Sequence, residues 1–382
     1  MNQKKVRNTL KKTLSYVLVA ALASLATWIA ADHIPNSKLE ELASVIDRRF
    51  IAEADQTAIQ DAAADAMVEA LGDRWSYYIP ASQQDFYEER RNNSYVGIGV
   101  SVMQRADGSG YDVVSVTSGG PAEEAGILAG DILTHADGEP LGQLIVSDVQ
   151  SRIMGEKNTK VVLTLLRDGE TLEISVTRKT IHTKSAYGQM LDGEIGYVRI
   201  ENFFDHSADD TIEEVEELTE AGAQKLIFDL RNNPGGYVHE LVKILDYLLP
   251  EGPIFRSISY SGKETIEKSD ADCLELPMAV LFNGNTYSAA EFFGAALSEY
   301  NWAVTVGEPT TGKGYYQTSH TFSDGSSVSL STGQYTTPNG VSLAEVGGLK
   351  PDVEVKLTES VATWQEDPQI RAAIAALEEE SK

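Results

Sequence analysis

Residues 278–300 read MAVLFNGNTYSAAEFFGAALSEY, and the fold prediction starts from this stretch. Five consecutive apolar residues, Met278 to Phe282, predict a strand that is buried on both faces. A polar turn follows, and Ser288 then opens an apolar helix that is predicted to run to Tyr300. A buried strand joined to a helix by a short turn is typical of an α/β sheet.

The same alternation of strands and helices extends on both sides of this stretch. Apolar strands are predicted at 195–200 and 225–230, and helices at 209–221 and 239–249. We therefore predict that residues 181–357 form one α/β domain with largely buried strands.

Residues 93–180 have a different texture, with short runs of alternating polar and apolar residues. The run at 160–166 is predicted to pair with 171–176 through an Asp-Gly turn, as a β-hairpin. Near the start lies a glycine-rich segment whose backbone N–H groups could converge on a carboxylate, namely Val96, Gly97, Ile98 and Gly99. This order of elements resembles a PDZ domain, in which that segment binds the C-terminus of a peptide. A small β domain with a structural glycine turn is the alternative.

The two ends of the chain are predicted to be helical. Residues 1–34 begin with a basic stretch and continue with an apolar run at 14–31, the pattern of an export signal. We favour an uncleaved signal anchor over a cleaved signal peptide, with the rest of the chain outside the cytoplasm. Residues 35–92 carry apolar residues at helical spacing, and within 358–382 an Asp-Pro pair at 367–368 predicts a terminal helix.

Composition excludes several classes of function. The formal net charge of −27 disfavours nucleic acid as a partner, because an acidic surface repels phosphate. One cysteine, Cys273, rules out an intramolecular disulfide framework. The six histidines form no His-Glu-x-x-His motif, and no metal, nucleotide or organic cofactor is indicated.

Three segments of the α/β domain carry candidate chemistry. The double glycine at Gly235 and Gly236 follows a buried strand and could expose N–H groups as an oxyanion hole. Ser288, with Glu291 three positions later, fits both a helix-capping box and a nucleophile at a helix N-terminus. Lys313, in a glycine-rich turn, is either a solvated lysine or a general base whose pKa burial lowers.

Taken together, the segments 231–236, 283–291 and 307–317 resemble the C-terminal processing peptidases, a serine protease family with a PDZ domain. The resemblance covers residues 36–357 and implies a multidomain α/β protein with a helical N-terminal region, a PDZ-like domain and a peptidase core of the ClpP/crotonase-like type. It implies the following roles: Ser288 as nucleophile, Lys313 as base, Gln317 as its orienting residue, and Gly235 or Gly236 with Ala289 as oxyanion donors. Substrates would be proteins with unstructured C-terminal tails, and the N-terminal helices resemble those that form homodimers in relatives.

Two departures from the family pattern bear on this reading. Tyr287 replaces a small residue before the nucleophile, and Met154 replaces an arginine that precedes the glycine ending the second PDZ helix. Coupling between peptide binding and activation is therefore in doubt. A catalytic pair of Ser288 with His239 is not supported by the spacing of any motif. The alternative function, from a different class of protein, is a PDZ scaffold that binds protein tails without cleaving them.

Overall fold

The computed structural model describes residues 37–357 and 363–380. The predicted signal segment at 1–34 lies outside these residues. Within them, no helix combines the length and the apolar character that crossing a bilayer requires. The chain divides into two units, residues 1–70 and 71–382.

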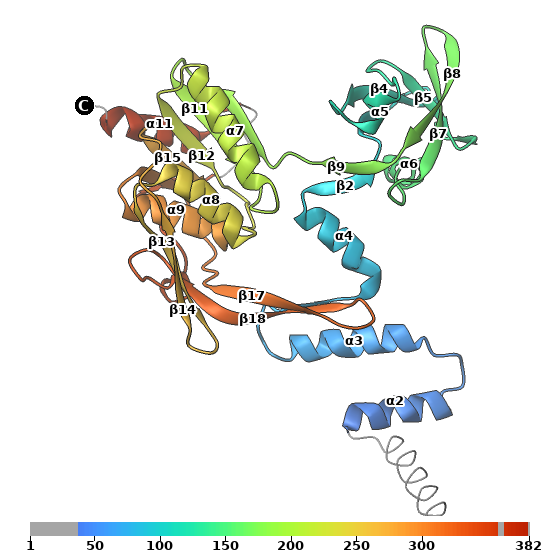
Figure 1. Cartoon of the computed structure of the whole chain (residues 1–382), viewed down its shortest axis with the longest axis horizontal. Coiled ribbons are helices and arrows are strands. Elements are labelled where there is room, and N and C mark those ends of the chain that lie inside the picture. The colour runs from blue at the N-terminus through green and yellow to red at the C-terminus, as the bar shows by residue number, and fades with distance from the viewer. Residues whose placement is uncertain (1–36, 358–362, 381–382) are drawn as a thin grey trace, which may run out of the picture. The chain divides into compact units, whose positions relative to one another are not determined.

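The first unit contributes two helices, α2 (Lys38–Arg49) and α3 (Gln56–Glu69) (Figure 1). Both begin at a side-chain cap, since Ser37 accepts the Glu40 N–H at 3.3 Å and Asp55 accepts the Ala58 N–H at 3.0 Å. Several apolar side chains of the pair are exposed: Leu39, Leu42, Val45 and Met67. The helices predicted for this part of the chain are therefore present.

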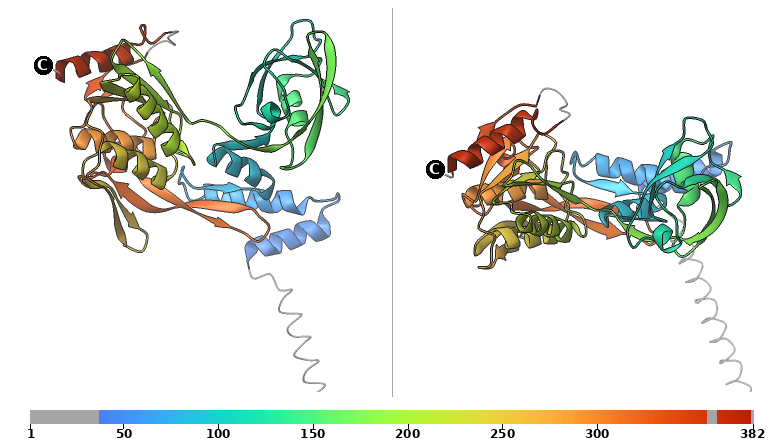
Figure 2. Two further views of the ribbon diagram at one scale, coloured as in Figure 1. Left: turned by 45° about the horizontal axis from the view of Figure 1, so that its top comes forward. Right: turned by 90° about the horizontal axis from the view of Figure 1, so that it is seen from above.

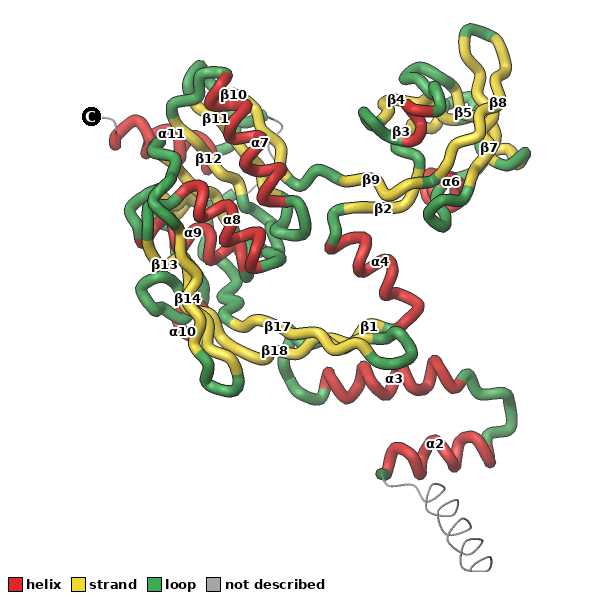
Figure 3. The backbone as a smooth tube through the Cα atoms, viewed as in Figure 1, coloured by secondary structure: helices red, strands yellow, loops and turns green. Residues whose placement is uncertain are grey.

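A six-stranded sheet forms the centre of the peptidase-like part (Figure 3). Its strand order is β10 (Ala186–Met190), β11 (Ile195–Ile200), β12 (Lys225–Asp229), β15 (Met278–Phe282), β16 (Ala303–Gly307) and β19 (Val353–Glu354). All neighbours are parallel except β10 and β11. The loops that follow β12, β15 and β16 therefore leave the same edge of the sheet, which brings the three candidate segments together.

Side chains alternate along the central strands between two apolar cores. Phe228 and Val280 face one core, which is covered by α7 (Ser207–Glu220), α8 (Val238–Leu248) and α9 (Ala289–Glu299). Ile227 and Leu281 face the other core, which α11 (Pro368–Glu380) covers (Figure 2). The terminal helix thus completes the sandwich, a role that its sequence did not suggest.

A second sheet supplies further parts of the site. Its strand order is β1 (Tyr77–Ile79), β18 (Ser327–Thr336), β13 (Gly252–Ser259) and β14 (Glu264–Ser269), and β17 (Tyr315–Thr321) also pairs with β18. Because β1 pairs with β18, the loop before β1 lies beside this sheet, and Ser331 N–H donates to Ser76 Oγ at 3.0 Å. Two helices flank these strands in sequence, α4 (Ala81–Arg91) after β1 and α10 (Leu343–Val346) after β18.

The PDZ-like part has its own sheet and its own apolar core. The strand order is β3 (Val100–Gln104), β4 (Tyr111–Val116), β5 (Ile132–Ala136), β7 (Lys160–Arg167) and β8 (Glu170–Thr177), and the short β6 (Glu139–Pro140) pairs with β5. Helices α5 (Pro121–Glu124) and α6 (Val146–Ile153) accompany it. A separate pair, β2 (Ser94–Gly97) and β9 (Lys179–His182), holds the entry and exit of the chain together.

Candidate active site

Ser288 lies at the junction between strand β15 and helix α9. Its backbone has φ of +61° and ψ of −130°, a combination that residues with side chains rarely adopt. Such strain costs about 1–3 kcal/mol and persists only where surrounding contacts enforce it. An ordinary helix-cap residue has an extended backbone instead, so this conformation favours the nucleophile over a plain cap. Many serine hydrolases also carry their nucleophile on a strained turn between a strand and a helix, where the side chain is exposed to the substrate. The Gly-x-Ser-x-Gly motif of those enzymes is absent here.

Glu291 connects the serine segment to the lysine segment. Its carboxylate is fully buried and accepts the Ser288 N–H and the Lys313 N–H, each at 2.8 Å. It also accepts the Gly312 N–H at 2.7 Å and the Thr310 hydroxyl. Four donors satisfy a buried charge that would otherwise be costly. Glu291, which the sequence suggested as part of a capping box, therefore also links the Ser288 segment to the Lys313 segment through hydrogen bonds to both backbones.

The glycine loop after β12 approaches the nucleophile closely. Gly235 has φ of +80°, and a Cβ at this position would lie 2.8 Å from both Ala289 N and Ser288 Cβ. The Gly235 N–H donates to Asn233 Oδ1 at 2.8 Å, which removes it as an oxyanion donor in this conformation. For the Gly236 and Ala289 N–H groups no acceptor is found among the described residues. Of the predicted donors, these two have N–H groups available to an oxyanion.

Lys313 projects from the loop between β16 and β17 into an aromatic environment. Its ammonium nitrogen lies 4.8 Å from the ring centroid of Trp75 and 5.9 Å from that of Tyr287. The two rings also contact each other, with centroids 5.5 Å apart. Aromatic rings exclude water from the amine, which disfavours the charged form, although their faces attract a cation.

Burial is the main reason that the pKa of Lys313 falls from 10.5 to about 8. The positive charge of Arg91 acts in the same direction, whereas the carboxylates of Asp73 and Glu291 oppose it. A lysine with this pKa is partly neutral near pH 8 and can accept a proton there. Lys313 is therefore in a largely desolvated environment and is not a solvated surface lysine.

Gln317 lies on β17, at an irregularity in its pairing with β18. Its side-chain amide donates to the Tyr315 carbonyl and to Ser331 Oγ, both at 3.1 Å. These bonds hold it within the hairpin instead of against the lysine. It nevertheless lines the same cleft, of about 480 Å³, as Ser288 and Lys313.

A cluster of ion pairs formed by Asp229, Arg231 and Asp367 lies at the start of the glycine loop. The Arg231 guanidinium donates to Asp229 Oδ1 at 2.9 Å and to Asp367 Oδ2 at 2.7 Å, and all three residues are buried. Asp367 also caps α11 by accepting the Gln369 N–H at 2.9 Å, as its position before a proline predicted. The cluster thus ties the loop at one end of β12 to the helix that covers the second face of the sheet.

Several residues of the cleft were not singled out in the sequence. Trp75 and Arg91 line the cleft, and Asp73 affects the pKa of Lys313. All three come from the segment between α3 and β2, more than 220 residues before Lys313 in the chain. The only local signal is the Asp-Arg-Trp-Ser turn that follows Gly72. That turn is ordinary in sequence, and only the pairing of β1 with β18 brings it to the site.

The PDZ-like part contains a second cleft, of about 480 Å³, between edge strand β3 and helix α6. Gly97, Ile98 and Gly99 line one end of it, and Val96 precedes them on β2. The Ile98 and Gly99 carbonyls accept N–H groups from Ala122 and Thr117, whereas no acceptor for the Ile98 or Gly99 N–H is found in the described part of the chain. An open strand edge next to unpaired N–H groups suits a peptide that adds a strand and ends in a carboxylate.

Met154 also lines this cleft and is 36% exposed. Its Cγ lies 4.0 Å from where a Cβ on Gly97 would be, so the thioether is next to the proposed carboxylate site. The end of α6 is held by another residue, because Arg178 donates to the Ile153 carbonyl at 2.7 Å and to the Arg152 carbonyl at 3.2 Å. An uncharged side chain therefore occupies the position where relatives were expected to have an arginine.

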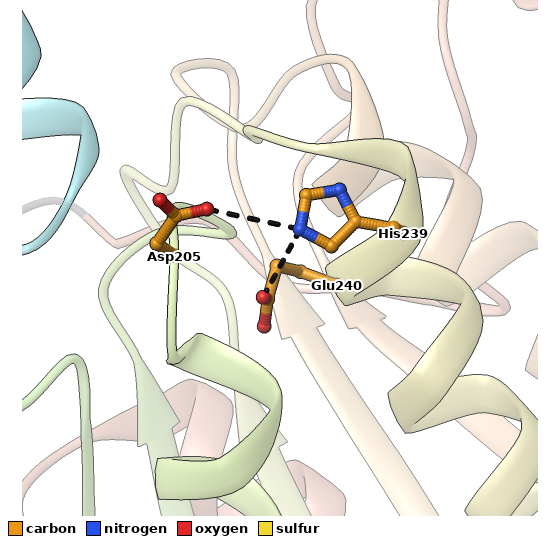
Figure 4. Close-up of side chains that lie close together, drawn as sticks. All are labelled: Asp205, His239 and Glu240. Atoms are coloured by element: carbon orange, nitrogen blue, oxygen red, sulfur yellow. Dashed lines mark ion pairs between the residues drawn. The ribbon is translucent and has the colours of Figure 1, made fainter.

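Asp205, His239 and Glu240 form the one group in the described ranges whose donor atoms are close enough together for a metal ion. Figure 4 shows one nitrogen of the His239 ring facing both carboxylates, with Nε2 at 3.7 Å from Asp205 and 3.3 Å from Glu240. Glu240 is already occupied, since it accepts the Ala208 N–H at 2.7 Å at the start of α7. This contact explains the burial of Glu240 without a metal. His239 is more than half exposed and has no contact with Ser288, so no Ser-His pair forms.

Comparison with known proteins identifies both parts of the second unit. The model of the PDZ domain family matches residues 95–177, and that of peptidase family S41 matches residues 194–355. A probable CtpA-like serine protease of Staphylococcus aureus (strain MSSA476) is 31% identical over 329 residues, which are 85% of this chain and 65% of that protein. The carboxy-terminal processing protease CtpA of Bacillus subtilis (strain 168) is 32% identical over 323 residues, 84% of this chain and 69% of that protein.

A solved structure also resembles the chain, the photosystem II D1 C-terminal processing protease. It is 26% identical with a TM-score of 0.49, over 88% of this chain and 90% of that one. The two family models and the CtpA relative confirm the resemblance inferred from the sequence motifs, and the described structure is a multidomain α/β fold with a PDZ domain. The chain belongs to peptidase family S41.

Proposed function

We propose that the protein is a serine endopeptidase that captures the C-terminal tails of proteins with its PDZ domain and cleaves them with a Ser288–Lys313 dyad. The observation that carries this proposal is the environment of Lys313. Its amine is shielded by aromatic rings, has a pKa of about 8 and shares a cleft with a strained serine. A merely structural lysine has no need of such an environment, whereas a general base does.

In the first half of the reaction, neutral Lys313 takes the proton of the Ser288 hydroxyl as its oxygen attacks the scissile carbonyl carbon. The N–H groups of Gly236 and Ala289 stabilise the oxyanion that develops. The tetrahedral intermediate then collapses, and the Lys313 ammonium returns the proton to the leaving amine. The C–N bond breaks, and an acyl-enzyme on Ser288 remains.

In the second half, Lys313 removes a proton from water, which attacks the acyl carbon. Collapse of this intermediate breaks the ester bond, and the proton on Lys313 returns to the Ser288 oxygen. Glu291 keeps the two residues at a constant separation through both halves, because it binds the backbone of each. Its role is to position Ser288 and Lys313.

A small apolar recess of about 10 Å³, roughly the room of one water molecule, lies next to Ser288 on the side expected for the acyl part of the substrate. It is lined by Gly236, Val238, Leu241, Phe255, Ser288, Ala289, Phe292 and Tyr335. No charged side chain is among these residues, so the recess favours an apolar group, and its size admits only a small one. We expect cleavage after small aliphatic residues such as alanine.

The proposal extends to location and assembly. The basic and apolar pattern of residues 1–34 supports an exported protein held at the cell membrane by its N-terminal segment, with secretion as the outcome if that segment is cleaved. The exposed apolar side chains of α2 and α3 support a homodimer formed through these helices.

The test is cleavage of an unstructured protein by the 382-residue chain and by its Ser288→Ala and Lys313→Ala variants, followed by mass spectrometry of the fragments. We expect turnover only with the unchanged protein, and partial activity for Gln317→Ala. A fully active Lys313→Ala variant would refute the dyad. Binding of tails without cleavage by the unchanged protein would instead favour a PDZ scaffold.

A further inference from the structure

The active-site cleft continues beyond Ser288 into a second, larger recess of about 780 Å³. The two share six lining residues: Arg74, Trp75, Arg90, Phe204, Pro234 and Tyr287. At its other end the cleft shares Gly236, Val238, Ser288 and Tyr335 with the apolar recess. The three spaces therefore follow one another, from an apolar end through the nucleophile to a polar end.

The polar end is lined by arginines that have no acidic partner. Arg74 stacks on Trp75, with the guanidinium carbon 4.2 Å from the ring centroid, and Arg90 is exposed beside it. No carboxylate oxygen lies within 4.0 Å of Arg74, Arg90 or Arg91 in the described part of the chain. The chain has a net charge of −27, so three arginines without acidic partners among the described residues make this cleft positively charged in an otherwise acidic protein.

Arg91 lines the active-site cleft itself, together with Ser288 and Lys313, next to the part that it shares with the larger recess. Its guanidinium carbon is 4.2 Å from the Tyr237 ring centroid, and Nη1 donates to the Tyr87 hydroxyl at 2.7 Å. Its Nε is buried and lacks a hydrogen-bond acceptor. Because this Nε has almost no accessible surface, a ligand would meet the positive charge and the remaining nitrogens of the guanidinium, which no carboxylate of the described residues neutralises.

The remaining charge in the larger recess does not cancel these arginines. Glu201 is its only acidic lining residue, and its carboxylate is paired with the Arg199 Nε at 2.6 Å. Planar guanidinium groups match the two oxygens of a carboxylate, with which they form charge-assisted hydrogen bonds. The lining therefore selects for a carboxylate and against a cation.

We propose that the arginine-lined end of the cleft binds a carboxylate of the substrate, so that the enzyme prefers tails with an aspartate or glutamate at a defined distance from the cleaved bond. The inference rests on the proposed function, because it assigns a substrate class to the same cleft. The free C-terminus of a tail carries the same chemical group and is the second possible source of it. An acidic side chain is favoured because the PDZ cleft already provides a place for the C-terminus.

A bound carboxylate would also act on the general base. Arg91 contributes to the low pKa of Lys313, and a carboxylate paired with Arg91 would offset part of that effect. The pH midpoint of kcat, which reports the enzyme–substrate complex, should then be higher for an acidic peptide than for its neutral counterpart. A purely structural role of Arg91 would leave the two midpoints equal.

The experiment uses internally quenched peptides with one cleavable bond after an aliphatic residue and an amidated C-terminus. A single glutamate, or glutamine as its neutral counterpart, is placed in turn at each position on both sides of that bond. For the unchanged protein we expect kcat/KM at one or two positions to be at least tenfold higher with glutamate, and this ratio should shrink in high salt.

The ratio of glutamate to glutamine rates should fall to about one in Arg91→Gln and in the Arg74→Gln, Arg90→Gln double variant. The double variant changes exposed side chains only, so the test does not depend on tolerance of a change at Arg91. Arg371→Gln is the matched control, since Arg371 is an exposed arginine on α11 outside all three recesses, and it should keep the full ratio.

The outcomes separate this inference from the function on which it rests. Equal cleavage of the glutamate and glutamine peptides at every position, or a ratio that survives both arginine variants, would overturn the carboxylate site alone. No cleavage of either set would overturn the proposed function and the site together. The same peptides with a free C-terminal acid test the second source. If the free acid is cleaved faster than the amide, and this gain is lost in both arginine variants, the site binds the tail's own carboxylate and the preference for an acidic side chain is overturned.

Discussion

The two glycine-rich loops of this protein are built in opposite ways. The loop at 232–236 beside Ser288 is held by Asn233, which is fully buried and bonds to the Ile200 carbonyl at 2.8 Å and to the Gly235 N–H at 2.8 Å. Phe203 fixes it further through backbone bonds to Gly235 and Tyr237. The segment 96–99 in the PDZ domain instead borders an open cleft. Val96 and Gly97 pair with β9, and Ile98 and Gly99 are held through their carbonyl oxygens.

This difference follows from what each loop has to bind. An oxyanion exists only fleetingly, so its donors must be in place before the reaction, and a loop held on every side provides that. A peptide tail is a stable ligand that brings its own backbone donors and acceptors, so its site has to leave a strand edge open. The loop at 232–236 is therefore rigid, whereas the segment at 96–99 is accessible to a peptide.

Gly235→Ala should break the catalytic loop and have the largest effect. A Cβ would collide with Ala289 N and Ser288 Cβ, and φ of +80° is unfavourable for alanine. We expect kcat to fall by about 10²–10³-fold, as for loss of an oxyanion donor. Steady-state kinetics on a short peptide measures this, and circular dichroism checks the fold. Activity within threefold of the unchanged protein would show that the loop tolerates displacement.

Glu291→Gln tests whether the two catalytic segments depend on one buried charge. The amide would place an NH₂ group against N–H donors that now meet a carboxylate oxygen. We expect kcat to fall by about 10–100-fold, with a smaller change in KM, because the positions of Ser288 and Lys313 would relax. Thr310→Val is the milder comparison. It removes the hydroxyl that donates to Glu291 and accepts the Leu349 N–H, but leaves the carboxylate and its three N–H donors in place.

The pH profile tests the state of the lysine. Because burial and Arg91 lower the pKa of Lys313 to about 8, the neutral base is lost as pH falls below that value. We expect kcat/KM to decrease about tenfold per pH unit below pH 7 and to level off above pH 9. In Arg91→Gln the same curve should move to higher pH, because a positive neighbour has been removed. A profile that is flat between pH 6 and pH 10 would contradict the assigned role.

Gly99→Ala should have the smallest effect on catalysis and sharpen the contrast between the loops. Gly99 has φ of +77°, and a Cβ would lie 3.1 Å from the Thr117 side chain. We expect binding of a tail peptide to weaken several-fold, measured by calorimetry, while cleavage of a peptide too short to reach the PDZ domain stays unchanged. Equal losses in both assays would mean that the two loops are coupled despite Met154.

Local patterns were enough for most of the fold. The apolar run at 278–282 is a fully buried strand, and the Asp-Gly turn at 168–169 joins β7 to β8 as predicted. Helix α9 begins directly after Ser288, within one residue of the prediction. These features depend on hydrophobic periodicity and turn chemistry, which act over a few residues.

Other features depend on contacts between distant segments. Helix α11 covers the second face of the sheet because Ile227 and Leu281 require an apolar partner there, which no local pattern announces. The strained backbone of Ser288 has no signature in the sequence, and neither does the commitment of the Gly235 N–H to Asn233. Each arises where two loops meet at one edge of the sheet.

The sequence by itself determined the family and the order of the elements, and it singled out Ser288, Lys313 and the glycine loop as candidates, because these features are carried by short motifs. Only the tertiary structure decided that Trp75 and Tyr287 shield Lys313, that Arg91 lowers its pKa and that three unpaired arginines share the cleft. The physical reason is distance along the chain. Desolvation and charge act through space, so segments more than 220 residues apart influence one amine only after the sheets have assembled.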